Sequence, residues 1–198
     1  GGVPMFLGGI VLALLTGMLI IGGIKRIADV ASYFVPLMVL IYFIGATIVI
    51  LNNLSHLGSG IVLIFEHAFT GTAATGGFVG ATLAQTIRFG VARGLFSNES
   101  GMGSAPIVAA AAKTNHPGKQ ALVSMTGTFL DTLIICSLTA LALSSSGVWV
   151  SGETGVALTI QAFSSGLPGN WGNIIVSSSA VTFGFSSILA WEYYGEKC

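Results

Sequence analysis

The chain has 198 residues, of which 53% are hydrophobic and 7% are charged, and its formal net charge is zero. Soluble globular domains carry roughly a quarter charged residues, so the composition excludes a water-soluble domain and predicts an all-α membrane protein in a lipid bilayer. With no excess positive charge we expect no nucleic-acid partner, and Cys136 and Cys198 show neither metal-ligand nor disulfide spacing.

The first two hydrophobic segments run over about residues 4–23 and 30–51. A helix needs roughly 20 apolar residues to cross a bilayer core of about 30 Å, and each segment meets that length. Lys25, Arg26 and Asp29 lie between them. We therefore expect two transmembrane helices joined by a short charged turn.

The third hydrophobic segment, about residues 59–93, is too long for one straight crossing. Residues 70–77 hold three glycines and three threonines, which raise the free energy of a continuous helix there. We predict a single crossing made of two half-helices and broken at 70–77.

Further along, a polar turn and loop over residues 94–118 precede a fourth span at about 119–143. Residues 144–173 follow, with a short surface helix expected from Glu153 to Phe163. A serine-rich fifth span covers about 174–194. The chain thus predicts about five transmembrane crossings within one domain, one of them a broken helix.

The basic residues test this arrangement, because Lys and Arg gather on the cytoplasmic side of short loops. All of them fall on one side of the predicted membrane: Lys25, Arg26, Arg88, Arg93, Lys113, Lys119 and Lys197. The pattern predicts an extracellular N-terminus, a cytoplasmic C-terminus, a cytoplasmic 94–118 and an extracellular 144–173, in a multi-pass protein of the cell membrane.

The break at 70–77 is the first candidate binding site, because unwound backbone at membrane depth is tolerated only where it is buried or lines a cavity. A half-helix N-terminus attracts a carboxylate and freed carbonyls coordinate a cation, which together suit a zwitterionic amino acid. Phe78 can wall such a pocket. The alternative is a plain glycine kink packed against a neighbouring helix.

The fifth span offers a second constellation, in which Thr182, Ser186 and Ser187 precede Trp191. Hydroxyl oxygens are hard ligands of the kind that sodium prefers. The alternative is that these hydroxyls bond the carbonyls of their own helix or hold neighbouring helices together.

Asp131 lies in the middle of the fourth span, where an acid is a functional candidate. A structural hydroxyl partner and a cation site are equally consistent with it. No nucleophile with a base, metal cluster or phosphate loop is present, and Ser104 does not stand in a G-x-S-x-G turn. We therefore predict no catalytic residues, with an intramembrane hydrolase as a remote alternative.

Residues 94–106 read Gly-Leu-Phe-Ser-Asn-Glu-Ser-Gly-Met-Gly-Ser-Ala-Pro. This stretch closely resembles the G-L-F-S-N-E-A-G-x-G-S-A-P motif of the alanine or glycine:cation symporter family, the sodium:alanine symporters of the amino acid-polyamine-organocation superfamily. Residues 22–28, 71–78 and 185–197 are similar to that family as well. Ser100 departs from the motif, which commonly has alanine there.

The resemblance implies a bacterial or archaeal secondary transporter that carries alanine or glycine with sodium as the coupling ion and no other cofactor. It also implies a leucine-transporter-like inverted-repeat fold of five plus five helices. By the same resemblance, substrate-binding residues are Thr72, Gly76, Gly77, Phe78, Ser187 and Trp191. Cation-binding residues are Thr182, Ser186 and Ser187, and gating or structural motif residues are Asn98, Glu99, Gly101, Gly103 and Ser104.

We expect the chain to be an internal or C-terminal fragment, because it lacks an initiator Met and ends directly after an apolar segment. The first repeat's broken helix and the third core helix of the family are absent, so the chain holds at most half a site. A channel or a structural membrane subunit remains an alternative, since a glycine-rich broken helix can also line a pore.

Overall fold

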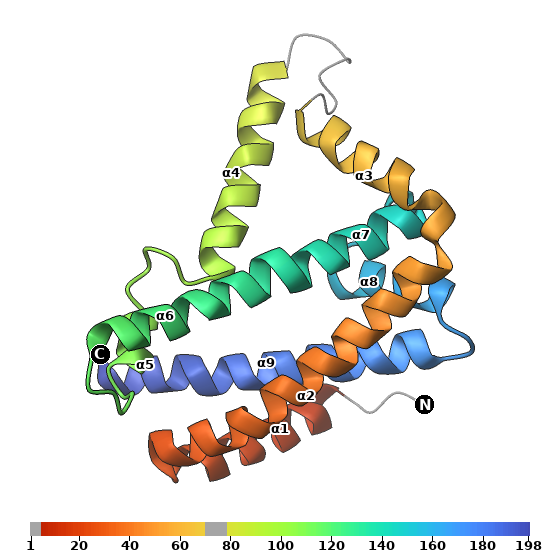
Figure 1. Cartoon of the computed structure of the whole chain (residues 1–198). Coiled ribbons are helices and arrows are strands. Elements are labelled where there is room, and N and C mark those ends of the chain that lie inside the picture. Colours follow the sequence, from red (N-terminus) through yellow and green to blue (C-terminus); the bar gives the residue numbers. More distant parts are fainter. Residues whose placement is uncertain (1–4, 70–78) are drawn as a thin grey trace.

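The computed structural model describes residues 5–69 and 79–198, and the side chains at 6–66 and 87–198. Every element in this part of the chain is a helix, in agreement with the predicted all-α class (Figure 1). The α-helices are α1 Met5–Ile20, α2 Gly23–Asn52, α3 Leu54–Phe69, α4 Val79–Ser97, α5 Ala105–Ala109, α6 Pro117–Thr128, α7 Ser137–Ser146, α8 Gly155–Gly166 and α9 Trp171–Lys197. A π-helical segment, Phe129–Cys136, joins α6 to α7, and a 3-10 turn, Val148–Ser151, precedes α8.

Three of the described helices are long and apolar enough to cross a membrane: α2, α9 and the continuous helix Pro117–Ser146, which we call the long helix. The apolar parts of α1 and α3 are shorter. The predicted third span corresponds to α3 and α4, and its break at 70–77 lies outside the described residues. The five crossings therefore remain a prediction.

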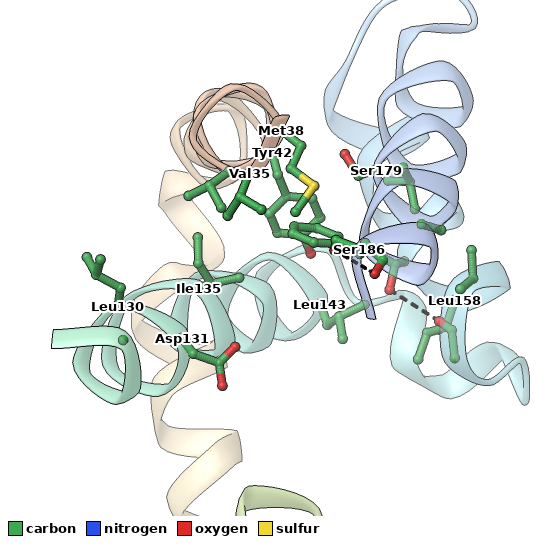
Figure 2. Close-up of a pocket in the computed structure, with 18 residues that line it drawn as sticks. Val35, Met38, Tyr42, Leu130, Asp131, Ile135, Leu143, Leu158, Ser179 and Ser186 are labelled. Atoms are coloured by element: carbon green, nitrogen blue, oxygen red, sulfur yellow. Dashed lines mark hydrogen bonds between the residues drawn. The ribbon is translucent and has the colours of Figure 1, made fainter. Parts of the chain in front are cut away.

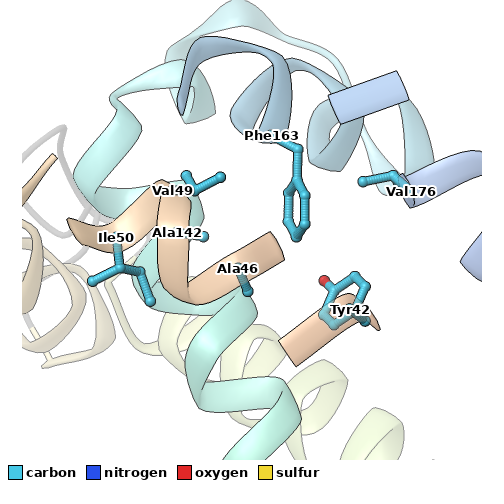
Figure 3. Close-up of a cluster of buried hydrophobic side chains, with 7 residues drawn as sticks. All are labelled: Tyr42, Ala46, Val49, Ile50, Ala142, Phe163 and Val176. Carbon is cyan, nitrogen blue, oxygen red and sulfur yellow. The ribbon is translucent and has the colours of Figure 1, made fainter. Parts of the chain in front are cut away.

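The core lies where α2 meets α7, α8 and α9. Val49 and Phe163 are fully buried there, and the Phe163 ring lies 5.2 Å from the ring of Tyr42. Figure 3 shows the cluster, whose buried members are Tyr42, Ala46, Val49, Ile50, Ala142, Phe163 and Val176. Four helices distant in sequence thus share one apolar contact region.

Small residues allow these helices to approach closely, as is common for helices in membranes. A Cβ atom added at Gly166 would lie 2.8 Å from the Cα of Val49, where α8 meets α2. One added at Gly172 would overlap the backbone of Phe163 and Ser164, where α9 meets α8. These glycines are needed for packing, because any side chain would push the helices apart.

Helix α8 differs from the surface helix that the sequence predicted. Its residues Ala162 and Phe163 are fully buried, and the helix packs between α2 and α9. The Asn52 side-chain nitrogen donates a hydrogen bond to the Gly166 carbonyl at 2.6 Å, which caps the C-terminal end of α8. Apolar contacts and this cap hold α8 in the bundle.

Helix α4 stands away from the packed helices and meets the long helix at its own C-terminal end (Figure 1). The meeting point lies at the π-helical segment, to which Ser97 and Asn98 are hydrogen-bonded. Short π-helical stretches within α-helices are rare and frequently occur at functional sites. The connection between α4 and the long helix is therefore a candidate functional region.

Candidate functional site

The turn of residues 97–104 follows α4 and carries the Ser-Asn-Glu sequence of the motif. Gly101 and Gly103 adopt φ angles of 76° and 81°, which residues with a Cβ rarely adopt. Glu99 has a φ of 52° and is the one non-glycine residue with positive φ in the described part of the chain. Such a backbone conformation persists only where the surroundings hold it in place.

The first two side chains of this turn bind the π-helical segment. The Ser97 hydroxyl donates a hydrogen bond of 2.6 Å to Asp131 Oδ2. Asn98 donates from Nδ2 to the Thr132 hydroxyl at 2.7 Å, and that hydroxyl donates back to Asn98 Oδ1 at 3.0 Å. Two adjacent residues of the turn thus bind two adjacent residues of the long helix.

The third side chain, Glu99, binds a different helix. Its Oε2 accepts a hydrogen bond from the Ser104 hydroxyl at 2.9 Å, and its two carboxylate oxygens lie 3.0 and 2.8 Å from the donating Tyr194 hydroxyl. Ser104 and Tyr194 are both buried. Glu99 therefore joins the turn to the C-terminal end of α9 and closes the turn on itself.

Trp191 lies at the same junction. Its ring stacks on Phe96 at a centroid distance of 6.0 Å and meets Tyr194 edge-on at 5.6 Å. The structure therefore places this predicted substrate-binding residue beside the 94–106 motif, with 43% of its surface exposed.

Ser187, another predicted substrate-binding residue, is exposed. The other predicted substrate-binding residues, Thr72, Gly76, Gly77 and Phe78, lie outside the described residues.

The predicted cation-binding hydroxyls of Thr182 and Ser186 bond their own helix. Thr182 donates to the carbonyl of Ser178 at 2.9 Å, and Ser186 donates to the carbonyl of Phe183 at 2.9 Å. This is the local bonding that the sequence offered as the alternative. A hydroxyl that donates its proton keeps lone pairs for a cation, so the assignment stays a prediction.

A cavity of about 810 Å³ lies between α2, the long helix, α8 and α9. Figure 2 shows Asp131 and Ile135 on the long helix at one side of it, and Ser179 and Ser186 on α9 at another. The remaining lining is mostly apolar. A mostly apolar cavity with a few polar groups is typical of a small-molecule site.

Sequence reasoning missed several members of this junction, among them Ser97, Thr132 and Tyr194. Ser97 belongs to the motif and directly precedes Asn98 and Glu99, but it was not among the predicted gating or structural residues. Tyr194 stands near the C-terminal end of an apolar span, where a tyrosine hydroxyl usually finds a hydrogen-bond partner when buried. That signal identifies a polar contact without identifying its partner.

Long apolar helices, close contacts through glycine and polar side chains that join helices define a helical membrane protein. The chain belongs to the sodium:alanine symporter family, whose model matches residues 2–198. The family predicted from the 94–106 motif is thereby confirmed. By its description, this family is one of membrane transport proteins.

Individual relatives agree with this placement. The chain is 43% identical over 201 residues to the sodium/alanine symporter AgcS of Methanococcus maripaludis, covering 100% of the chain and 43% of that protein. It is 47% identical over 197 residues to an uncharacterized transporter of Haemophilus influenzae, covering 99% of the chain and 43% of that protein. It is 41% identical over 189 residues to a probable sodium/glutamine symporter, GlnT, of Bacillus subtilis, covering 95% of the chain and 38% of that protein. The chain spans about two-fifths of the length of these relatives.

Proposed function

We propose that the protein containing this chain carries a small neutral amino acid, alanine or glycine, across the cell membrane together with sodium. The observation that carries this proposal is the match of residues 2–198 to the sodium:alanine symporter family. The relative AgcS bears the name of a sodium/alanine symporter. The name of GlnT mentions glutamine instead, so the size of the accepted side chain needs a direct test.

The mechanism that we propose is alternating access in a leucine-transporter-like fold, with the crossing broken at 70–77 as the moving element. Thr72, Gly76, Gly77 and Phe78 would hold the amino acid together with Ser187 and Trp191. Thr182, Ser186 and Ser187 would offer oxygen atoms to sodium. A bound sodium ion shifts the protein toward the state that holds substrate only if it binds that state more tightly.

In this mechanism the motif residues Asn98, Glu99, Gly101, Gly103 and Ser104 act as a gating joint on the cytoplasmic side. The hydrogen bonds of the turn tie α4 to the long helix and to α9. Any movement of α4 against those helices must break these bonds or move all three elements together. The joint therefore limits which movements of α4 are accessible.

The first experiment measures uptake of labelled alanine by the full-length protein in liposomes, with and without an inward sodium gradient. We expect saturable accumulation that requires the gradient and that excess glycine inhibits more strongly than excess glutamine. Equal uptake without sodium would contradict the coupling. Flux that does not saturate would indicate a channel. Stronger inhibition by glutamine than by glycine would indicate glutamine as the preferred substrate.

A second experiment tests Trp191 with Trp191→Ala. Loss of its stacking on Phe96 and of its proposed substrate contact should lower alanine uptake about tenfold, since aromatic contacts contribute about 0.5–1.5 kcal/mol beyond their buried area. Trp171→Ala is the matched control, because Trp171 lies at the opposite end of α9 and is 59% exposed. Equal losses in both variants at equal protein levels would remove Trp191 from the site.

A further inference from the structure

We infer that Asp131, Thr132, Ser97 and Asn98 form a sodium site where α4 meets the π-helical segment. The inference rests on the proposed sodium coupling and places an ion at residues other than Thr182, Ser186 and Ser187. It is carried by the position of Asp131, by its surroundings and by the oxygen atoms that the structure brings together there.

Asp131 lies near the middle of the long helix, Pro117–Ser146. A carboxylate on a membrane-spanning helix is costly unless it is paired. Among the described side chains the one ion pair joins Lys197 to Glu196, and no basic group pairs with Asp131. A hydrogen bond from the Ser97 hydroxyl leaves the negative charge in place. A bound cation would compensate that charge.

The side chains around Asp131 supply oxygen atoms of the kind that sodium binds. The carboxylate lies 2.6 Å from Ser97 Oγ, and beside it Thr132 Oγ1 lies 3.0 Å from Asn98 Oδ1. The set combines a carboxylate, two hydroxyls and an amide oxygen, without thiol or imidazole. Hard cations prefer such oxygen ligands. The four side chains form two hydrogen-bonded pairs, Ser97 with Asp131 and Asn98 with Thr132, on adjacent residues of the turn and of the long helix.

The backbone supports the same location. Asp131 and Thr132 both belong to the π-helical segment Phe129–Cys136, and π-helical stretches occur frequently at functional sites. Asp131 is also among the residues that line the 810 Å³ cavity. The proposed ligands Asp131 and Thr132 thus lie on an irregular stretch of the long helix.

The site would couple ion binding to the position of α4. Two of its ligands stand at the C-terminal end of α4 and two on the long helix, so a bound ion holds the two elements together. An ion that bridges them favours the conformation in which they touch, by the difference in its affinity for the two conformations. Glu99, the next residue of the turn, is hydrogen-bonded to Tyr194, so the position of α9 is linked to the same turn.

The test uses the purified full-length protein and measures binding of labelled alanine while NaCl replaces choline chloride at constant ionic strength. Asp131→Asn keeps an oxygen that accepts the Ser97 hydrogen bond but removes the charge. We expect the sodium concentration for half-maximal alanine binding to rise about tenfold or more, as for the loss of a contact to a charged group. Asp29→Asn is the matched control, because Asp29 is an exposed acid near the beginning of α2.

A second pair of variants keeps the test decisive if Asp131→Asn does not fold. Thr132→Ala removes an oxygen ligand and should also raise the sodium requirement, whereas Thr132→Ser keeps the hydroxyl and should leave it unchanged. Direct binding of radioactive sodium, measured without alanine, should fall in Asp131→Asn and in Thr132→Ala.

The outcomes separate this inference from the proposed function. If alanine binding to the unmodified protein ignores sodium, the proposed coupling fails. If it requires sodium and both Asp131→Asn and Thr132→Ala leave the requirement unchanged, the coupling stands and this site is wrong. If Asp131→Asn instead abolishes a dependence of alanine binding on pH, a proton occupies the site and the assignment of sodium is overturned.

Discussion

The Glu99 carboxylate joins the motif to α9 through the hydroxyl of Tyr194, so Tyr194→Phe tests that contact at the scale of one residue. The variant removes a hydrogen bond to a charged acceptor, and such bonds contribute about 1.5–3 kcal/mol. We expect a lower midpoint of thermal unfolding for the full-length protein in detergent. Slower alanine uptake should accompany it.

Tyr193→Phe is the control for that prediction. Tyr193 is also buried and directly precedes Tyr194, but its hydroxyl forms no hydrogen bond among the described residues. We expect its unfolding midpoint to match that of the unmodified protein. If Tyr193→Phe destabilises the protein as much as Tyr194→Phe, the loss reflects packing of the aromatic rings rather than the bond to Glu99.

At this scale the sequence identified both partners of the Glu99–Ser104 contact but one partner of each contact between helices. The 94–106 motif singled out Asn98, Glu99 and Ser104, and hydrophobic spacing singled out Asp131. Glu99 and Tyr194 are separated by 95 positions in the sequence, and their contact depends on how α9 packs beside the turn. No local pattern carries that information, which is why the partner of Glu99 was missed.

At the scale of helices, Gly172 tests the close contact between α8 and α9. A Cβ atom there would overlap the backbone of Phe163 and Ser164, which cannot move aside as a flexible side chain can. Gly172→Ala should therefore destabilise the full-length protein by about 1–3 kcal/mol, the usual range for overpacking. The measurement is thermal or denaturant unfolding in detergent.

Gly184→Ala supplies the matched control within the same helix. A Cβ atom at Gly184 meets nothing within 4 Å, so alanine fits and its better helix propensity should leave stability equal or slightly higher. A similar loss in both variants would mean that the intact protein packs α9 differently from the arrangement described here.

The lengths of the hydrophobic segments predicted the residue ranges of the long helices. They did not predict how those helices pack against one another. The predicted spans at 119–143 and 174–194 correspond to helices at Pro117–Ser146 and Trp171–Lys197. The π-helical segment was not predicted. The number of hydrophobic residues in a segment is the same whether the backbone hydrogen bonds join residues four apart, as in an α-helix, or five apart, as in a π-helix. The burial of α8 was missed because its length is too short for a membrane span.

At the scale of the whole molecule, much apolar surface lies outside the core. Large hydrophobic side chains are exposed along α1, α2 and the long helix, including Phe34, Leu122 and Leu133. Exposed apolar surface of this extent marks contact with lipid or with other protein. The chain spans about two-fifths of the length of its relatives, whose remaining length offers further protein surface for such contact.

The orientation of the chain in the membrane can be tested across the long helix. At 1.5 Å per residue its 30 residues extend about 45 Å, enough to cross a bilayer core of about 30 Å. Lys113 precedes this helix and Glu153 follows it, and both are exposed. The distribution of basic residues predicts Lys113 in the cytoplasm and Glu153 outside.

The measurement introduces Lys113→Cys or Glu153→Cys into the full-length protein after every native cysteine, Cys136 and Cys198 among them, has been replaced by serine. A membrane-impermeant maleimide should label Glu153→Cys in intact cells and Lys113→Cys only after the membrane is opened. The reverse pattern would invert the predicted orientation. Labelling of both variants in intact cells would contradict the crossing itself, because one span between two sites must place them on opposite sides of the bilayer.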